Sequence, residues 1–300
     1  MPRAEVSLIL IHYRQDALTA HVLRRLSEIQ IRIPFEMVIV DNGSPSPPPL
    51  PATPFPRTLL RLERNMGYAA ACNRGAEAAS APLLFFLNND IDFDADFIAP
   101  LAASLAKHPE CGLIGPALCF PGGRFQLSWG DAPTPLAEAR ERRRQRESRG
   151  GGGPLCAKRD AEGRGGREVD WITGAAMLMP RAVFNAVGGF DEGYFFYFED
   201  VDLCARVRAS GSTVRYEASV CLVHFGGGSQ DKPSPEIARS YRLGQLRYYA
   251  RHASRISYSA LKAYLSAMAI ARALRDPASR PVMRDLLRHL LRSPRQPFRT

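Results

Sequence analysis

The 300-residue chain lacks the sequence signals of several common protein classes. Its six cysteines are scattered, without a Cys-x-x-Cys pair or a Cys/His spacing that suits zinc. The first expected strand, residues 6–11, is followed by neither Gly-x-Gly-x-x-Gly nor a P-loop. No apolar run approaches the roughly 20 residues that a bilayer-crossing helix needs. These absences argue against a zinc module, the usual nucleotide-binding loops and an integral membrane protein.

The cysteines and the N-terminus together indicate a compartment. Most cysteines sit in apolar contexts, which favours reduced, buried thiols in a cytosolic protein. A first strand beginning at about Val6 leaves no room for a signal peptide. We therefore expect a cytoplasmic protein, associated at most with the inner face of the membrane.

The charge balance says less about the core site than about the periphery. The formal net charge is +10, but much of the excess lies late in the chain and in one loop. Such an excess is compatible with nucleic acid, an anionic membrane surface or anionic small substrates. A nucleic-acid partner is disfavoured, because the core lacks interleaved aromatic and basic residues.

Strand-like and helix-like segments alternate along the first two thirds of the chain. This order predicts an α/β fold with a doubly wound, mostly parallel central sheet and flanking helices. The expected strands are 6–11, 35–40, 57–62, 83–87 and 213–223, and the expected helices 17–29, 67–79, 96–107, 181–187 and 203–209. We expect irregular loops at 45–56 and at the Arg- and Gly-rich stretch 140–153, and a basic helical extension from 235.

The most informative stretch begins with the apolar run 83–87 and ends in Asn88, Asn89 and Asp90. In open α/β sheets, ligands bind at the carboxyl ends of the strands. Carboxylates there, with no Lys or Arg among them, favour Mg²⁺ or Mn²⁺ and therefore a phosphate-bearing substrate. The alternative is a polar turn. Further acids, Asp92, Asp94 and Asp96, are expected to start the next helix.

Two later positions are candidates for chemistry. Glu199 and Asp200 follow an aromatic run, where apolar walls would raise a carboxyl pKa to suit a general base. Acids are equally favoured at a helix N-terminus, and both interpretations can hold. His224 ends a strand and precedes three glycines, which permit close approach of a ligand. A lone histidine is more often structural, but neutral imidazole can complete a metal site.

Taken together, these segments resemble family 2 glycosyltransferases of the GT-A fold, in the subgroup with bacterial rhamnosyltransferases and galactofuranosyltransferases. The resemblance runs from about Val6 to Ser229. The matching segments, in the family's order, are 38–44, 65–75, 86–90, 171–175, 189–192, 198–203 and 224–229.

The resemblance implies roles for individual residues. It places Asp200 as the catalytic base and Glu199 as a contact to acceptor or donor. A divalent cation, Mg²⁺ or Mn²⁺, would be held by Asp90 and His224, with Asn88 as a weaker ligand. Acceptor-side residues would be Trp171, Gly174 and Glu199. The donor nucleotide-sugar would contact His12, Tyr13, Asp41, Asn42, Asn65, Gly67, Asn73, Asn88 and Asn89.

Two positions depart from the family pattern. Asn88 stands where many relatives have an acid, which weakens the expected metal site. Ala71 replaces a frequent glycine, so the approach of that turn to the donor is in question.

The resemblance also implies a domain division. Residues 1–232 would form the GT-A domain, with a nucleotide-binding half at about 1–120, a variable loop at 121–168 and an acceptor half at about 169–232. Residues 233–300 would form the helical C-terminal extension. That extension either packs on the catalytic domain or attracts anionic lipid.

The implied activity is inverting, metal-dependent transfer of a sugar, with rhamnose the leading candidate. The donor would be a dTDP- or UDP-sugar, and the acceptor a hydroxyl of a glycan or lipid-linked molecule in cell-surface polysaccharide synthesis. The alternative is a nucleotide-sugar-binding protein without catalysis.

Overall fold

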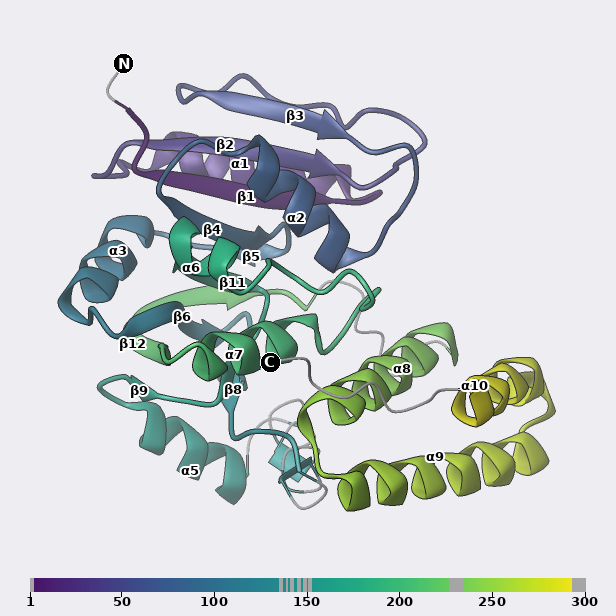
Figure 1. The fold of residues 1–300 in the computed structure, drawn as a ribbon. Helices are drawn as coiled ribbons and strands as arrows, with labels where there is room; N and C mark the ends of the chain where they lie inside the picture. The colour runs from purple at the N-terminus through teal and green to yellow at the C-terminus, as the bar shows by residue number, and fades with distance from the viewer. Residues whose placement is uncertain are drawn as a thin grey trace.

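A computed structural model describes residues 3–134, 137–138, 140, 143–144, 147, 150, 153–226 and 235–292. Its centre is one mixed sheet whose main path runs β3-β2-β1-β4-β11-β6-β12-β5 (Figure 1). The bounds of these strands are β1 (Val6–His12), β2 (Phe35–Asp41), β3 (Arg57–Arg61), β4 (Leu83–Asn88), β5 (Ile91–Asp92), β6 (Cys111–Cys119), β11 (Ala176–Pro180) and β12 (Thr213–His224).

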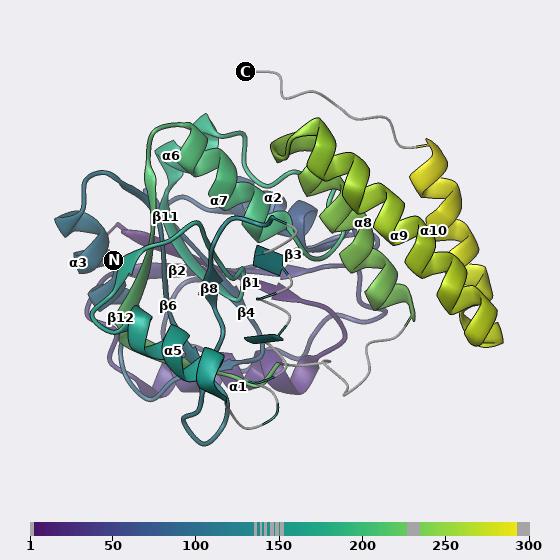
Figure 2. The same cartoon turned by 90° about the horizontal axis from the view of Figure 1, so that it is seen from below.

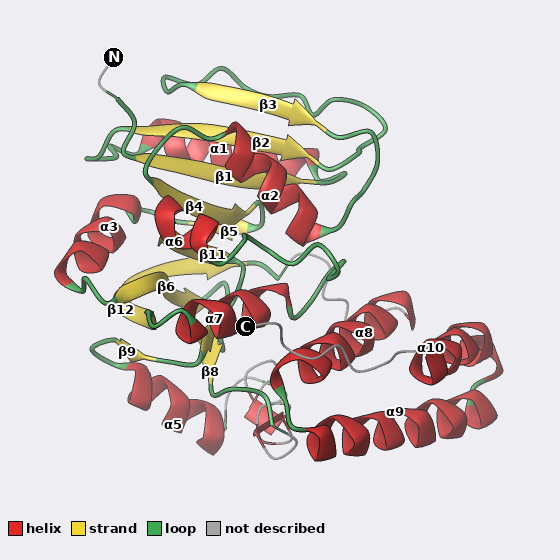
Figure 3. Cartoon of the chain, viewed as in Figure 1, coloured by secondary structure: helices red, strands yellow, loops and turns green. Residues whose placement is uncertain are grey.

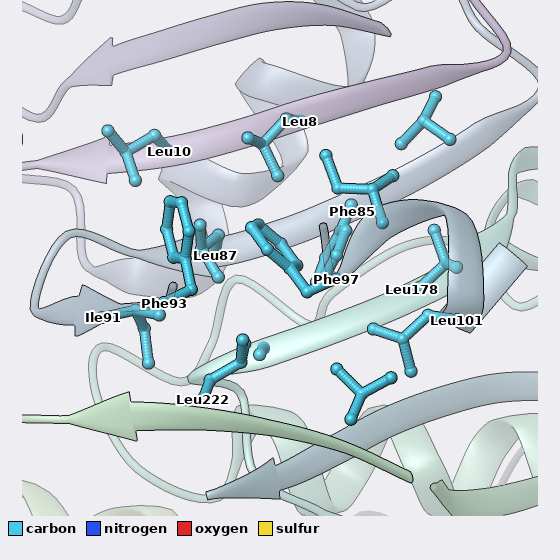
Figure 4. Close-up of a cluster of buried hydrophobic side chains, with 14 of the residues drawn as sticks. Leu8, Leu10, Phe85, Leu87, Ile91, Phe93, Phe97, Leu101, Leu178 and Leu222 are labelled. Carbon is cyan, nitrogen blue, oxygen red and sulfur yellow. The ribbon is translucent and has the colours of Figure 1, made fainter. Parts of the chain in front are cut away.

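The inner strands are apolar on both faces, which explains why they appear in the sequence as continuous hydrophobic runs. In β4, Phe85 and Leu87 enter one core cluster, and Leu84 and Phe86 enter the other. Figure 4 shows the first cluster, where Phe85 and Phe97 meet edge-on with their ring centroids 5.5 Å apart. Strands so buried need helices on both sides of the sheet.

Helices cover both faces of the sheet (Figure 2). Side chains of α1 (Asp16–Glu28) and α3 (Ile98–Lys107) enter one core cluster. The other cluster takes side chains from α2 (Tyr68–Ala78), α6 (Arg181–Ala186) and α7 (Glu199–Ala209). The α/β architecture and its mostly parallel sheet are therefore confirmed, and the expected helices lie within a few residues of their predicted bounds.

The sequence did not predict β6, one of the central strands. Its glycines and Pro116 are typical of turns, yet every residue of the strand is buried. A Cβ on Gly115 would lie 2.7 Å from Ile172 Cδ1, so tight packing requires glycine there. Pro116 pairs with Glu217, next to an irregularity in the β12 register, where a missing backbone N–H is tolerated.

Strand β11 runs antiparallel to both of its neighbours. It pairs with β4 from Ala176↔Leu87 to Pro180↔Leu83, and with β6 at Leu178↔Ile114. It therefore joins the parallel group β3-β2-β1-β4 to the parallel pair β6-β12 within one continuous sheet.

The variable loop predicted for 121–168 contains regular structure in its described part. This comprises β7 (Phe125–Gln126), β8 (Trp129–Gly130), α5 (Pro154–Gly163) and β9 (Arg167–Glu168). Strand β8 pairs with β10 (Trp171–Ile172) in a separate two-stranded sheet. A solvated loop was predicted for 140–153, but residues 140, 143–144 and 147 are helical, so the prediction is wrong for them. Most other residues of this stretch lie outside the described ones. The segment 45–56 is irregular, as predicted.

The chain continues into α8 (Pro235–His252), α9 (Arg255–Arg275), a 3₁₀ turn (Pro277–Ser279) and α10 (Arg280–Arg292). Figure 3 shows these helices beside the sheet layers. They share a third core cluster with Tyr194 and Phe198, which precede α7. The helical extension is thus confirmed, and it packs on the segment that precedes α7. None of the described helices is long and apolar enough to cross a membrane.

Thiols of the described cysteine side chains are all reduced. Cys72, Cys111, Cys119 and Cys204 are buried, whereas Cys221 is exposed. Burial raises the pKa of the Cys72 thiol well above its usual range, which makes that thiol a poor nucleophile. The predicted buried, unreactive thiols therefore fit four of these five positions.

Candidate active site

Strand register brings the predicted site residues to one edge of the sheet. His12 is level with Asp41, and Ile11 is level with Asn88, so β1, β2 and β4 end side by side. Pairing of His224 with Ile91 brings the end of β12 to the turn that follows β4. The polar cluster thus lies where ligands bind in α/β sheets.

Asp90 and His224 meet in this cluster. His224 Nε2 lies 3.2 Å from Asp90 Oδ1, and both side chains are largely buried. On the other side of the ring, His224 Nδ1 lies 3.1 Å from Gln126 Oε1. Because an amide oxygen only accepts, Nδ1 is the donor in this bond. Without a proton on Nε2, its lone pair then faces a carboxylate oxygen.

Two facing lone pairs require a cation or a proton between them. One carboxylate oxygen and one imidazole nitrogen are suitable ligands for Mn²⁺, and the carboxylate suits Mg²⁺. The residues therefore fit a divalent cation. Within the described ranges, no group of three or more His, Cys, Asp or Glu side chains could hold a metal. Further ligands would have to come from amide oxygens, water or a substrate phosphate.

The two asparagines of the cluster are placed differently. Asn88 is the last residue of β4 and is half-buried, and its backbone N donates to Ala175 O (2.9 Å). Asn89 is buried, and its Nδ2 donates to Thr19 Oγ1 (3.2 Å). Asn89 thus holds the turn to α1, while Asn88 stands at the strand end.

The acids after Asp90 were expected to start a helix, and this is wrong for Asp92. Asp92 belongs to β5 and accepts a hydrogen bond from Arg25 Nε of α1 (3.0 Å). Asp96 does accept from the backbone N of Ile98 and Ala99 at the start of α3. Asp92 pairs with α1 because β5 turns back along β12, which the sequence did not reveal.

Asp41, predicted to contact the donor base, is fully buried and already bonded. Its Oδ2 accepts from Arg61 Nε (2.9 Å) and its Oδ1 from Ser44 N (2.9 Å). Burial alone would raise the pKa of Asp41, but the Ser44 and Arg61 hydrogen bonds outweigh it and lower the pKa. Asp41 is therefore an anion that fixes β3 and the loop after β2.

His12 is also buried, and its Nδ1 lies 2.8 Å from Thr19 Oγ1. Burial lowers the pKa of His12, so the ring is neutral near pH 7. Tyr13, the next residue, is half-buried beneath the Arg14 guanidinium. Of His12 and Tyr13, Tyr13 is the residue with exposed surface that a nucleotide-sugar donor could contact.

Three predicted donor-side residues form a hydrogen-bonded loop. Asn42 Nδ2 donates to Asn65 Oδ1 (3.1 Å) and Gly67 O (3.2 Å), and Asn42 Oδ1 accepts from Met66 N (2.9 Å). Gly67 has φ +88°, and a Cβ there would lie 2.5 Å from Phe195 O. Asn42 and Gly67 therefore shape the loop that leads into α2.

Asn73 connects α2 to the segment that precedes α7. Its Nδ2 donates to Phe190 O (2.9 Å), and its Oδ1 accepts from Phe190 N (2.9 Å). Such a reciprocal pair is structural. The predicted contact of Asn73 with the nucleotide stays a prediction.

Glu199 and Asp200 occupy the first turn of α7, as the helix-start interpretation predicted, while the general-base interpretation stays a prediction. Asp200 Oδ2 accepts from Gly174 N (2.8 Å), and Oδ1 accepts from Val201 N (2.8 Å). Burial raises the pKa of Asp200, although these amide donors oppose the shift. Burial and the Asp200 carboxylate raise the pKa of Glu199 well above its usual range. The pair therefore carries one proton, on Glu199, when Asp200 is ionised.

On the acceptor side, Trp171 Nε1 donates to Asp131 O (3.0 Å), and the ring is half-exposed. Sequence reasoning missed Tyr68, whose hydroxyl donates to Gly174 O (2.7 Å). It also missed Gln126, the partner of His224. Tyr68 lay inside a segment matched to the family, whereas Gln126 gave no signal because it sits in the variable loop.

Known proteins are similar to this chain in sequence. The family model "Glycosyl transferase family 2" matches residues 7–162, about half of the chain. The N-acetylglucosaminyl-diphospho-decaprenol L-rhamnosyltransferase of Mycobacterium tuberculosis is 27% identical over 267 residues, covering 77% of this chain and 81% of the relative. The O-antigen biosynthesis protein RfbC of Myxococcus xanthus is 32% identical over 215 residues, covering 67% of this chain and 16% of the relative.

A solved structure matches the fold along most of the chain. The mannosyltransferase PcManGT of Pyrobaculum calidifontis, in complex with GDP-Man and Mn²⁺, has a TM-score of 0.51 at 16% identity, covering 97% of this chain and 71% of that one. The S. aureus protein TarS 1–349, in complex with UDP-GlcNAc, has a TM-score of 0.52 at 14% identity, covering 82% and 65%. At these identities the likeness shows the GT-A fold alone.

The fold and the sequence matches define a glycosyltransferase enzyme. The chain belongs to glycosyl transferase family 2. Its resemblance to the rhamnosyltransferase-containing subgroup is confirmed by the relatives that carry that name.

The raised pKa of Asp200 predicts the pH dependence of turnover. In its predicted role as the base, Asp200 must be ionised to accept a proton, so kcat should fall as the pH drops through its raised pKa, above the usual Asp value of about 3.9. Glu199→Gln should leave this acid limb in place, because Glu199 is already neutral there. A pH series of initial rates for both proteins measures this. An acid limb at or below pH 4 in the wild-type protein would contradict the assignment.

Removing the partner of His224 should weaken metal binding. In Gln126→Leu nothing accepts the Nδ1 proton, so the ring orientation is lost and Mn²⁺ affinity should fall about 10–100-fold. Isothermal titration with Mn²⁺ measures the affinity without an assay of turnover. Leu127→Ala, at the next position, is the matched control. Equal affinities of Gln126→Leu and the wild type would exclude this role for Gln126.

Proposed function

We propose that the protein is an inverting, divalent-metal-dependent glycosyltransferase. It moves a sugar from a nucleotide-diphospho-sugar to a hydroxyl of a glycan or lipid-linked acceptor, in the synthesis of a cell-surface polysaccharide. Rhamnose is the leading candidate for the sugar, and dTDP or UDP for the nucleotide.

One observation carries this proposal. The Ala175 carbonyl accepts from Asn88 N at the end of β4, and the neighbouring Gly174 N donates to Asp200 Oδ2. The candidate base and the strand end next to Asp90 are therefore joined through two consecutive residues. A nucleotide-sugar-binding protein without catalysis has no need for a half-buried, hydrogen-bonded carboxylate at this position.

The chemistry follows from these positions. Asp200 accepts the proton of the acceptor hydroxyl, and the acceptor oxygen forms a bond to the anomeric carbon. The bond from that carbon to the diphosphate oxygen breaks, and its electron pair leaves with the diphosphate. Attack from the face opposite the leaving group inverts the anomeric centre. Asp90 and His224 would hold the divalent cation, which when bound neutralises charge on the diphosphate.

Glu199 is suited to orient a substrate. Its Oε2 is buried and has no hydrogen-bond partner among the described residues. Burial and the neighbouring Asp200 carboxylate raise the pKa of Glu199 well above its usual range, so Glu199 is the member of the pair that keeps its proton when Asp200 is ionised. A neutral carboxyl can donate to a sugar hydroxyl while Asp200 accepts from the attacking one.

Relatives support the choice of donor and acceptor. The name of the M. tuberculosis relative specifies L-rhamnosyl transfer to a diphospho-decaprenol-linked acceptor. The solved neighbours were captured with GDP-Man and Mn²⁺ or with UDP-GlcNAc. These names motivate dTDP-rhamnose as the first donor to test, with GDP-mannose and UDP-sugars as competitors.

The decisive variant is Asp200→Asn. It keeps the size of the side chain but removes the base, so transfer should fall about 10²–10⁴-fold while donor binding survives. Transfer is measured as product formed from dTDP-rhamnose, UDP-sugars and GDP-mannose with a polyprenyl-diphosphate-linked acceptor. Donor binding is measured by thermal shift with and without Mn²⁺.

Three results would decide against the assignment. Near-normal turnover in Asp200→Asn would exclude Asp200 as the base. Donor binding without transfer in the wild type, across acceptors, would favour the binding protein. If the donor-induced thermal shift is the same with and without Mn²⁺, the proposed role of the metal is wrong.

The extension offers a surface for the inner face of the membrane. Exposed apolar residues recur along one side of α9 at spacings of three and four: Ile256, Ala260, Ala263, Ala267, Ile270 and Leu274. The helix has no acidic residue, and it carries Arg255, Lys262, Arg272 and Arg275. Figures 1 and 2 show α9 on the outside of the molecule. An apolar stripe with only cations beside it matches an anionic bilayer.

Replacing the large residues of this stripe should weaken vesicle binding. Ile270→Ser with Leu274→Ser removes two exposed side chains that would enter the lipid, so affinity should fall at least about tenfold. Flotation with vesicles of anionic and of zwitterionic lipid measures this, with Ala260→Ser as the matched control. Equal flotation of wild type and double variant, or no preference for anionic lipid, would refute this surface.

A further inference from the structure

The turn that precedes the candidate base has an unfavourable backbone. Tyr197 and Phe198 have φ angles of 73° and 71°, in the left-handed region that side-chain-bearing residues rarely adopt. Two such residues in succession bring the chain directly into Glu199 and Asp200. A conformation of this kind persists only where surrounding contacts hold it, and it is often found at functional sites.

Helix α8 supplies contacts that fit this turn. Gly244 faces the turn, and a Cβ there would lie 2.4 Å from Tyr197 O. The Phe198 ring packs on Tyr241 and Tyr248, with ring centroids 5.2 and 5.8 Å apart. The absent side chain at Gly244 thus lets the helix approach the backbone of the turn directly.

The same helix fixes both ends of the segment that contains the turn. Before the turn, Asp191 accepts from Arg247 through both oxygens, at 2.9 and 2.8 Å. After it, Asp202 Oδ1 lies 2.7 Å from His252 Nε2. Burial would raise the pKa of Asp202, but His252, Arg206 and Arg251 outweigh it and lower the pKa. The segment 191–202 is therefore held at two charged points and at the turn between them.

The opposite side of the segment touches the donor-side loop. Phe195 O accepts from Tyr68 N (2.9 Å), and Gly67 leaves room for the Phe195 backbone. A shift of the turn away from α8 would move this contact and the start of α7 together. The place of Asp200 thus depends on a helix that lies beyond residues 7–162, the range that the family model matches.

We propose that α8 positions the candidate base by holding the Tyr197–Phe198 turn in its left-handed conformation, with Gly244 as the positioning residue at the contact. This inference rests on the proposed role of Asp200. It assigns the C-terminal extension a part in turnover besides packing, through residues that do not touch the substrate themselves.

Gly244→Ala tests the contact. Alanine is the better helix former, so helix propensity alone would stabilise the variant. The new Cβ would instead push the turn away from α8. We expect kcat to fall at least about tenfold because the base is displaced, while the donor KM stays within about twofold. Hydrogen exchange of the peptide containing 191–202 should rise, a readout that needs no activity.

Gly163→Ala is the matched control. Gly163 ends α5, in another part of the fold (Figure 1), and a Cβ there would lie 2.8 Å from Tyr216 Cε1. This variant should lose stability without the selective rise in exchange at 191–202. Arg247→Met is the second test, because it breaks the Asp191 contact without a clash. It should show the same selective rise and a smaller loss of kcat.

The readouts separate this inference from the proposed function. Unchanged exchange at 191–202 in both α8 variants would overturn the positioning role, whatever the turnover. A selective rise in exchange with unchanged kcat would also overturn it. If the wild-type protein transfers no sugar, but exchange still rises in the α8 variants, the proposed function is rejected. The contact by which α8 holds the turn is then still supported.

Discussion

The hydrogen bond from Gly174 N to Asp200 Oδ2 is the interaction on which the candidate site depends. The short link that carries it leaves β10 and enters β11, the strand that pairs with β4. Its other groups bind as well, since Gly174 O accepts from Tyr68 and Ala175 O from Asn88. One backbone segment thus sets the carboxylate of α7, the start of α2 and the end of β4 in fixed relation.

Much of this could be predicted from the sequence, because buried strands and amphipathic helices leave strong patterns. The apolar run of β4 located Asp90, and the aromatic–acidic stretch located Asp200. The prediction failed where packing overrides composition. Gly115 and Pro116 are typical of turns, yet both lie in a central strand. The space beside β10 is too narrow for a side chain at Gly115, and Pro116 pairs next to an irregularity in the β12 register.

For the site residues too, the sequence predicted position along the chain better than it predicted contacts. The apolar runs placed Asp90 and His224 at strand ends, and the family resemblance made them ligands of one cation. The structure adds how they meet, through the pairing of β12 with β5. The resemblance assigned Asp41, Asn42 and Asn73 to the donor, whereas the structure shows their polar atoms bonded to the protein. Such residues shape a pocket through the backbone that they hold. A sequence pattern cannot distinguish a residue that holds the backbone from one that contacts the donor directly, because both roles require the same side chains.

The antiparallel strand β11 has a consequence for how the enzyme can change over evolution. It ties the proposed nucleotide side and the proposed acceptor side into one continuous hydrogen-bonded sheet. Movement that admits substrates would then come from segments outside the sheet. The same rigidity frees those segments to diverge, because a new loop can admit a different sugar or acceptor while the distance between cation site and base stays constant.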